Sequence, residues 1–321
     1  MKRRSVSVTG ATGFLGSHIA LELMARGWSV RAIARPGNAK PLPQGVDVRE
    51  APLDRAALTG AIDGCDVVIH AAGLTRARSD RAYRSVNVDG TRAVVAAANE
   101  AGARIVHISS LAAIGPGTPD RPVHEDDRPQ PLTAYGRSKF ASEAVVRSDA
   151  HVKWTILRPS AVYGPNDRQF LPLVRLATRG IFPLLGRSSA AFTLLYAGDL
   201  ARAVATAADD ERSVGQAIFI GHRDPQTAYS VLRQLAQAVD RPYKPRRIPG
   251  VLVRALALAG ESAWRFGRRP TFDMARFAEL RAEGFVCSVE RARAVIGFTA
   301  EVSLAEGLEQ TVKWYRERGW I

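Results

Sequence analysis

A tyrosine and a lysine one helical turn apart are the residues of this sequence best suited to chemistry. Tyr135 and Lys139 lie in a run whose spacing places both on one face of an α-helix. A phenol has a pKa of about 10 and is a poor acid or base at neutral pH. An ammonium group about 4 Å away would stabilise the phenolate by up to about 4 kcal/mol at an effective dielectric of about 20, and would lower the pKa of Tyr135 by about a unit or more.

Ser110 adds a hydroxyl at the end of a predicted strand over 105–108. Such a hydroxyl can hydrogen-bond a carbonyl oxygen as negative charge accumulates on it. With Tyr135 and Lys139 it suits hydride transfer coupled to protonation of that oxygen. A Tyr-x-x-x-Lys spacing alone is common and mostly structural. The serine and the glycine turn upstream favour the catalytic interpretation.

Three glycines at steps of three follow the first predicted strand directly. Gly10 would let the chain turn sharply, Gly13 would let phosphate oxygens approach a helix N-terminus, and Gly16 would let that helix pack closely on the sheet. An ordinary tight turn is the alternative, which the position in the first strand–helix unit disfavours. We therefore expect dinucleotide contacts from Gly10, Thr12, Gly13, Phe14, Leu15 and Gly16.

The second predicted strand ends on a basic residue where NAD-binding chains usually carry an acidic one. There, Asp or Glu about 20 residues after the glycines accepts hydrogen bonds from the adenine ribose. Here no acidic residue occurs between Glu22 and Asp47. Arg35 can instead pair with a 2′-phosphate, or it can be a solvated arginine at a strand end. We predict NADP(H) in preference to NAD(H), with Arg35 as the discriminating residue.

The positions of these residues require a parallel sheet. Short aliphatic runs alternate with Ala-rich segments of helical length, which is typical of β-α-β units. The predicted strands cover 6–8, 30–33, 67–69, 105–108 and 154–157, with 217–220 rejoining the sheet, and helices are expected over 83–101 and 133–148. Gly102 is a plausible C-cap of the first, and Asp199 is expected to cap a helix over 200–208.

The fold class predicted is therefore α/β, a doubly wound parallel sheet of the Rossmann type with a smaller, mostly helical C-terminal domain. Residues 1–165 with 192–222 would form the dinucleotide-binding domain. Residues 166–191 with 223–321 would form the substrate domain.

Composition excludes several other classes. The 321 residues are 46% apolar and 24% charged, which is ordinary for a globular chain. No apolar run reaches the ~18–20 residues that cross a bilayer, and the longest candidate, 251–259, contains Arg254. Two cysteines, Cys65 and Cys287, cannot build a disulfide framework or a cysteine-based metal site. We expect a cytoplasmic protein without a signal peptide, membrane span or structural metal.

The net charge of +14 is concentrated at the ends of the chain. Residues 1–49 carry 8 basic and 2 acidic side chains, and residues 241–321 carry 15 and 9. A solvated arginine-rich surface or the attraction of an anionic cofactor or substrate accounts for this excess. Nucleic acid or a membrane is the weaker interpretation, because no zinc-finger, basic-zipper or aromatic-and-basic pattern accompanies the charge.

Taken together, the motifs resemble the extended short-chain dehydrogenase/reductase family, the NAD-dependent epimerase/dehydratase group that also holds dihydroflavonol reductases and 3β-hydroxysteroid dehydrogenases. The resemblance covers essentially the whole chain in order. It rests on Thr9-Gly10-x-x-Gly13-x-x-Gly16, His70-Ala71-Ala72-Gly73, Ser110, Tyr135-Gly136-x-x-Lys139 and Arg158-Pro159-x-x-Val162-Tyr163-Gly164-Pro165.

The resemblance implies roles for particular residues. Ser110, Tyr135 and Lys139 would be catalytic, with Asn87 as a buried support for the lysine and part of a water relay; a side chain at a helix start is the alternative for Asn87. The run His70, Ala71, Ala72 and Gly73 would line the cofactor, and the backbone from Pro159 to Val162 would face the nicotinamide. A homodimer through the helices 79–101 and 133–148 is also implied. One departure is Glu50-Ala51-Pro52, where the family usually has Gly-Asp-Leu near the adenine.

Other departures narrow the reaction. Dehydratases of this family carry acidic residues after the catalytic hydroxyl, whereas Leu111 and Ala112 follow Ser110. Epimerases usually carry an Arg-Asp pair where this chain has Phe192 and Thr193, and they retain NAD. We predict an NADP(H)-dependent enzyme that reduces a ketone or aldehyde, or oxidises the alcohol, of a largely hydrophobic small molecule. An NDP-sugar epimerase and a non-catalytic NADP-binding sensor or complex subunit are the alternatives.

Apolar residues of the second domain could line the substrate pocket, or could be plain core. They are Phe170, Leu171, Leu173, Val174, Leu176, Ile181, Phe182, Leu184 and Leu185, with the run 251–258. Arg168, Arg175, Arg179 and Arg187 lie nearby, as solvated surface or as contacts for a carrier's phosphate. No nucleic-acid partner is expected.

Overall fold

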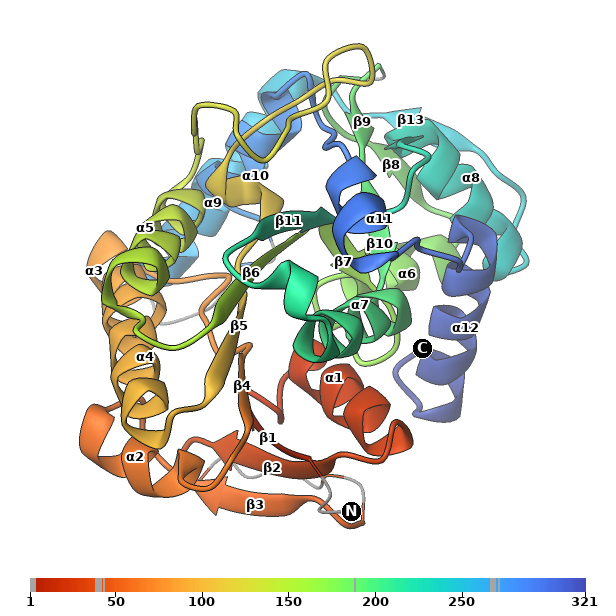
Figure 1. Cartoon of the computed structure of the whole chain (residues 1–321). Helices are drawn as coiled ribbons and strands as arrows, with labels where there is room; N and C mark the ends of the chain where they lie inside the picture. Colours follow the sequence, from red (N-terminus) through yellow and green to blue (C-terminus); the bar gives the residue numbers. More distant parts are fainter. Residues whose placement is uncertain (1–3, 38–41, 43, 188, 266–269, 271) are drawn as a thin grey trace.

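The computed structural model describes the chain except residues 1–3, 38–41, 43, 188, 266–269 and 271. A seven-stranded sheet of order β11-β6-β5-β4-β1-β2-β3 forms its centre, and every neighbouring pair is parallel (Figure 1). Its strands are β1 (Ser5–Thr9), β2 (Ser29–Ala34), β3 (Asp47–Glu50), β4 (Val67–His70), β5 (Arg104–Ile108), β6 (Trp154–Pro159) and β11 (Ala217–Ile220). The predicted doubly wound α/β fold is confirmed.

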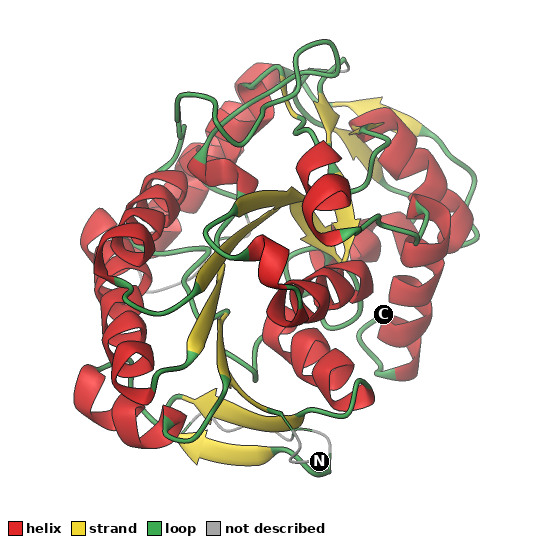
Figure 2. Ribbon diagram, viewed as in Figure 1, coloured by secondary structure: helices red, strands yellow, loops and turns green. Residues whose placement is uncertain are grey.

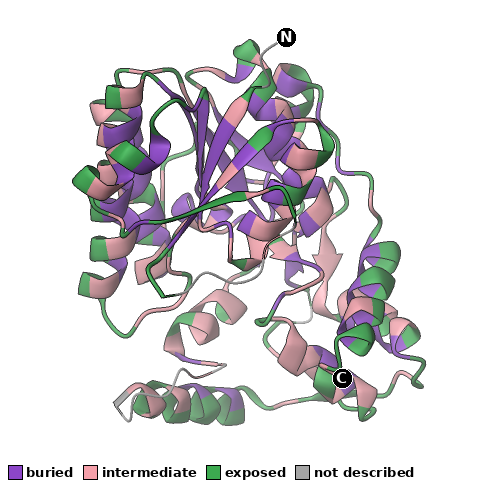
Figure 3. Ribbon diagram, turned by 90° about the horizontal axis from the view of Figure 1, so that it is seen from below, coloured by how far each residue is buried: buried purple, intermediate pink, exposed green. Residues whose placement is uncertain are grey.

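Helices cover both faces of this sheet (Figure 2). One hydrophobic core joins one sheet face to α1 (Phe14–Ala25), α7 (Ala197–Asp209) and α11 (Glu290–Ile296). A second core joins the other face to α2 (Arg55–Ile62), α4 (Gly90–Ala101) and α5 (Ala134–Asp149). The central strands are buried on both sides, as Figure 3 shows. Their sequences are therefore continuous apolar runs.

All six strands predicted from the sequence are present in the sheet, and β3 is the one that was missed. Its four residues are polar or exposed because it is the edge strand, so it carries no apolar signal. The helix predicted over 83–101 is continuous from α3 (Asp80–Tyr83) through a π-helical segment, Arg84–Asp89, to α4. Gly102 ends it in the left-handed conformation, at φ +65°, as predicted.

The remaining elements gather mainly beyond the carboxyl edge of the sheet. The helices are α6 (Leu171–Thr178), α8 (Ala228–Ala238), α9 (Gly250–Arg265), α10 (Met274–Arg281) and α12 (Leu304–Glu317), with 3₁₀ turns at Leu111–Ala113 and Glu211–Ser213. The short strands are β7 (Ala161–Tyr163), β8 (Phe182–Leu184), β9 (Ala191–Phe192), β10 (Leu194–Tyr196), β12 (Gln226–Thr227), β13 (Pro245–Arg247) and β14 (Gly284–Phe285). The division into two domains remains a proposal; every strand of the large sheet comes from the segments assigned to the first.

A third hydrophobic core contradicts part of the predicted substrate pocket. Val174 and Phe182 are fully buried and pack with Leu235, Leu308 and Tyr315 from α8 and α12. They hold the second domain together and do not line a pocket. The run 251–258 lies apart from them on α9, where most of its side chains are exposed. Within the described residues, no helix has the length and apolarity needed to cross a bilayer.

Asp199 does not cap a helix, contrary to the prediction. Helix α7 begins two residues earlier, and the buried carboxylate accepts the backbone N–H groups of Glu301 and Val302 at 3.2 and 3.0 Å. Arg202 donates to its other oxygen at 2.6 Å. Asp199 therefore ties α7 to the segment that leads into α12.

A buried ion pair connects α5 to the sheet. Arg158 on β6 donates from Nε and from a terminal nitrogen to the two oxygens of Glu143, at 3.0 and 2.7 Å. Ser109, at the end of β5, donates to the same carboxylate at 2.5 Å, and Arg158 also donates to the backbone oxygen of Glu125 at 2.8 Å. Both charged side chains are almost completely buried. The register of α5 against the ends of β5 and β6 is therefore specified by charge as well as by packing.

Replacing Glu143 with Ala is expected to lower the free energy of unfolding by about 3–5 kcal/mol, because the buried guanidinium of Arg158 loses its counter-charge. Urea denaturation of the variant and the wild type measures the difference. Glu283→Ala, which removes an exposed partner of Arg187, is the matched control and should change stability little. A loss no larger than that of the control would contradict this role of the pair.

Candidate active site

The glycine turn has the backbone geometry that a bound dinucleotide needs. Gly10 adopts φ +73°, and its N–H donates to Ile33 O at the end of β2. A side chain at Gly10 would meet the backbone of Ala72 at 2.9 Å. At Gly16 a Cβ would lie 2.1 Å from Gly10 O, so a side chain there would push α1 away from the turn. Gly16 therefore allows α1 to approach the glycine turn closely, in addition to the predicted close packing of α1 on the sheet.

The first turn of α1 is open toward the carboxyl edge of the sheet. Gly13 is the exposed N-cap residue and no side chain caps the helix. The amides of Phe14 and Leu15 have no acceptor within the helix, and together with the helix dipole they favour an anion. Thr12 is half-buried between the first two glycines. These residues fit the diphosphate of a dinucleotide.

A chain of hydrogen bonds links this turn to the helix that carries Asn87. Thr91 Oγ1 donates to Asn87 O at 2.7 Å, so it accepts from Nε2–H of His70 at 3.0 Å. Nδ1 of His70 then accepts from Thr9 Oγ1 at 2.8 Å, and Thr9 Oγ1 accepts the N–H of Ala72 at 3.2 Å. Burial, with a smaller effect of the Lys139 charge, lowers the pKa of His70 to about 3. His70 is a neutral, fully buried connector whose side chain does not face a cofactor, whereas Ala71 and Ala72 are half-buried and Gly73 is exposed.

Asn87 is fully engaged by its neighbours. Its Oδ1 accepts Leu74 N–H at 2.7 Å, and its Nδ2 donates to Leu74 O at 3.0 Å and to Ser138 Oγ at 2.8 Å. It lies within the π-helical segment, a feature frequent at functional sites. The side chain therefore supports α5 beside Lys139 by joining it to the loop after β4. It is not a side chain at a helix start.

The structure brings Ser110, Tyr135 and Lys139 together at the carboxyl edge of β5. Ser110 Oγ accepts the N–H of Ala112 at 3.2 Å, which leaves its hydrogen free to be donated. A Cβ on Gly136 would lie 2.3 Å from Ala112 O, so the glycine after Tyr135 allows α5 to approach the turn that holds Ser110. Lys139 is 4% exposed, and within the described residues its Nζ makes no hydrogen bond or ion pair.

The pKa of Tyr135 differs from the prediction. Burial raises it, and the hydroxyl of Ser110 acts in the opposite direction. Burial also lowers the pKa of Lys139 to about 8, with Glu143 opposing that shift. In this structure, desolvation of the phenol outweighs any stabilisation of the phenolate by Lys139. The tyrosine is therefore neutral and holds the proton that a reduction requires.

Helix α10 contributes a residue that the sequence analysis missed. Arg276 lies close enough for its charge to lower the pKa of Tyr135, while Glu279 raises it. The guanidinium is held by Glu279 at 2.8 Å and by Gln169 Oε1 at 2.9 Å. No sequence motif marks Arg276, because Tyr135 and the hydrogen-bond partner Gln169 are both more than a hundred residues away in the sequence. The charges of Glu279 and Arg276 therefore both act on the phenol of Tyr135, and that of Glu279 acts more strongly.

The remaining predicted cofactor residues lie around the same edge. Arg35 is exposed just after β2 and has no ion-pair partner among the described residues. Beside it, Glu50 accepts the N–H of Gly37 at 3.3 Å. Pro159 is buried at the end of β6, and Val162 packs against the sheet from β7. His18 on α1 hydrogen-bonds Pro165 O at 2.8 Å and so joins the glycine turn to the loop after β7.

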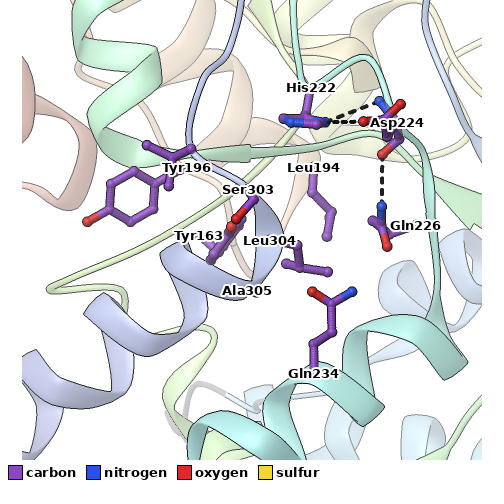
Figure 4. Close-up of a pocket in the computed structure, with 11 residues that line it drawn as sticks. Tyr163, Leu194, Tyr196, His222, Asp224, Gln226, Gln234, Ser303, Leu304 and Ala305 are labelled. Carbon is purple, nitrogen blue, oxygen red and sulfur yellow. Dashed lines mark hydrogen bonds and ion pairs between the residues drawn. The ribbon is translucent and has the colours of Figure 1, made fainter.

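A separate hollow of about 190 Å³ lies between α8, α12 and β10, as Figure 4 shows. Its lining includes His222, Asp224 and Gln234, with His222 and Asp224 paired at 3.6 Å. None of the predicted catalytic or cofactor-binding residues lines it. It is distinct from the candidate active site.

Comparison with known proteins identifies the family. The model of the NAD-dependent epimerase/dehydratase family matches residues 6–221, from β1 to the end of β11. The chain belongs to this family. The resemblance seen in the sequence is confirmed, and this family member is an NAD(P)-dependent enzyme of the short-chain dehydrogenase/reductase type.

Relatives of this family member include reductases and a sugar-nucleotide enzyme. Ceramide reductase of Caulobacter vibrioides is 32% identical, with 99% of this chain and 96% of that protein covered. The 4-hydroxy-2-methyl-3-oxo-4-farnesyl-3,4-dihydroquinoline-1-oxide ketoreductase of Stigmatella aurantiaca is 29% identical over 94% of each chain. The solved structure of MoeE5 in complex with UDP-glucuronic acid and NAD is 28% identical, with a TM-score of 0.77 over 98% of this chain and 99% of that one.

The buried ammonium predicts a pH dependence of stability. The pKa of Lys139 is about 8 in the folded chain and about 10.5 when unfolded. Between these values the unfolded chain binds more protons, so stability should rise with pH. Relative to Lys139→Met, the wild type should gain about 2 kcal/mol in free energy of unfolding between about pH 7 and about pH 9.5.

Urea denaturation of the cofactor-free protein at both pH values measures this gain. Lys313→Met, on the exposed side of α12, is the control and should track the wild type. A constant difference between wild type and Lys139→Met across this range would show that Lys139 is not a buried ammonium.

Proposed function

We propose that this protein is an NADP(H)-dependent reductase of a ketone or aldehyde on a largely hydrophobic small molecule, acting through Ser110, Tyr135 and Lys139. The observation that carries the proposal is Lys139, a side chain only 4% exposed, one turn from Tyr135, whose Nζ has no hydrogen-bond or ion-pair partner among the described residues. A buried ammonium is costly unless it serves a ligand. The ribose hydroxyls of a dinucleotide are ligands of the right kind.

The chain's own residues supply the proton chemistry. Ser110 donates its hydroxyl hydrogen to the substrate oxygen, because a carbonyl oxygen can only accept, while Ser110 Oγ itself accepts Ala112 N–H. Tyr135 gives its proton to that oxygen as negative charge develops there. Lys139 then stabilises the phenolate that remains. When bound, the reduced nicotinamide supplies the hydride.

The relatives support an apolar substrate. Ceramide reductase and the farnesyl-dihydroquinoline ketoreductase are both named for reactions on molecules with long hydrocarbon chains. In this chain Arg276 on α10, held by Gln169, acts on the pKa of Tyr135 and could hold a polar head group near it. A ketone with a polar head and a hydrocarbon tail fits this arrangement.

An NDP-sugar epimerase is the second candidate, favoured by the likeness to MoeE5 with its bound UDP-glucuronic acid and NAD. Against it, the positions where epimerases carry an Arg-Asp pair are occupied by Phe192, within β9, and by Thr193, which is buried and accepts Cys287 N–H at 3.2 Å. A retained cofactor with no net consumption of NADPH would favour the epimerase.

A homodimer through α4 and α5 remains part of the proposal. Phe140 on α5 is an exposed aromatic side chain on one of these helices, which is consistent with a partner there. The mass of the protein in solution, before and after Phe140→Ser, decides whether these helices form the interface.

Tyr135→Phe is expected to bind NADPH normally and to lose turnover by a factor of about 10²–10⁴, because the proton donor is removed while the ring still packs. NADPH oxidation with a panel of medium- and long-chain ketones and keto-sugars measures turnover, and fluorescence titration measures binding. Tyr196→Phe removes a hydroxyl that contacts Gln310, away from the site, and serves as the control. Near-normal kcat in Tyr135→Phe would refute the assigned role.

Arg35→Asp is expected to shift the cofactor preference from NADP(H) toward NAD(H). Losing a charge-assisted contact with the 2′-phosphate corresponds to about 1.5–3 kcal/mol, or a change of about 10- to 150-fold in the ratio of kcat/KM values. Arg49→Asp, on the neighbouring β3, tests whether any charge change at this edge has the same effect. If the ratio is unchanged in Arg35→Asp, the preference must be set elsewhere.

A further inference from the structure

Helix α9 exposes large apolar side chains to an unusual degree. Val251, Leu252, Leu256 and Leu258 are 79, 59, 55 and 49% exposed, and no other described helix has so many exposed large apolar residues. Its buried side is apolar too, through Val253 and Ala257. Apart from Arg254, the exposed residues of 251–258 are apolar, and an exposed apolar surface of this size marks a contact with another apolar surface or phase.

Basic residues accompany this apolar surface. Between Asp240 and Glu261 the chain carries no acidic residue and five basic ones, namely Arg241, Lys244, Arg246, Arg247 and Arg254. Lys244 and Arg246 are exposed on and beside β13, just before α9, and Arg254 is exposed on the helix itself. The combination of an exposed apolar face with a basic rim is typical of helices that lie in the surface of an anionic bilayer.

We infer that α9 binds the surface of an anionic lipid bilayer, with its apolar side chains among the acyl chains and its basic neighbours at the headgroups. The helix has 16 residues and a length of about 24 Å, so it is too short to cross the bilayer and lies along it. Figure 3 shows α9 at the outer edge of the molecule, and none of the described residues covers its exposed apolar side chains. A second copy is a poorer occupant, because a two-fold contact of α9 on α9 would bring two basic clusters together.

The same helix is one element away from the candidate active site. It packs against α10, which carries Arg276 close to Tyr135. A Cβ on Gly260 would lie 1.8 Å from Phe272 O, so this glycine allows α9 to lie directly on the segment that leads into α10. Arg76 holds that segment to the first domain by donating to Pro270 O at 2.7 Å. Bilayer binding would therefore place the α10 side of the cleft next to a source of lipid substrate; this last step rests on the proposed function.

Flotation of the full chain with vesicles tests the inference. The protein should float with phosphatidylcholine vesicles that contain phosphatidylglycerol, float less with phosphatidylcholine alone, and be partly released by high salt. Leu252→Ser combined with Leu256→Ser should weaken binding at least tenfold, whereas Leu21→Ser with Ile181→Ser, two exposed apolar residues elsewhere, should not.

Charge reversal gives a second test on the same vesicles. Lys244→Glu with Arg246→Glu should lose about fivefold in affinity for each positive charge removed, whereas Arg121→Glu with Arg128→Glu, also exposed, should lose much less. No binding by the wild type, or equal binding by all variants, would overturn the inference. So would an unchanged vesicle affinity in Leu252→Ser/Leu256→Ser together with conversion of a wild-type dimer to a monomer.

Turnover of a water-soluble ketone without vesicles separates this inference from the proposed function. The α9 variants should keep that turnover. If the wild type binds vesicles and reduces no ketone, the proposed function fails and the membrane surface stands. If the wild type reduces ketones and binds no vesicle, the membrane surface fails and the proposed function stands.

Discussion

The ammonium of Lys139, which has no hydrogen-bond or ion-pair partner among the described residues, is the constraint that the rest of the site depends on. A cation removed from water without a counter-ion is costly, and here the cost appears as a lowered pKa. Glu143, one turn further along α5, offsets part of it and is itself neutralised by Arg158. The contacts that hold α5 from several directions keep Lys139 in this buried position.

Four contacts hold α5, and each comes from a different segment of the chain. Arg158 on β6 and Ser109 after β5 both donate hydrogen bonds to Glu143. Asn87 in the π-helical segment donates to Ser138. Gly136 lies close to the turn that holds Ser110. The chain of hydrogen bonds through His70 extends this rigidity to the glycine turn. The glycine turn, the hydroxyl of Ser110 and the phenol of Tyr135 are therefore positioned relative to one another by the protein itself. A preorganised site requires this.

Sequence reasoning succeeded where one element carries its own signal. The buried strands were predicted because both faces are covered and their residues are apolar, whereas β3 was missed because an exposed edge strand is polar. The glycine turn and the Tyr135–Lys139 pair were found because their geometry is local. Asp199 was misjudged and Arg276 was missed, because the partners Val302 and Gln169 that fix their side chains lie more than a hundred residues away in the sequence.

By itself the sequence determined the family, the parallel sheet and the residue types at its carboxyl edge, since periodicity and short spacings are properties of single elements. Only the tertiary structure decided that Val174 and Phe182 are core, that burial raises the pKa of Tyr135, that Arg276 reaches the active site, and that α9 has an uncovered apolar face. Burial is created by segments far apart in the chain, so no local pattern of residues reveals which apolar side chain will be covered and which charge will be left without a partner.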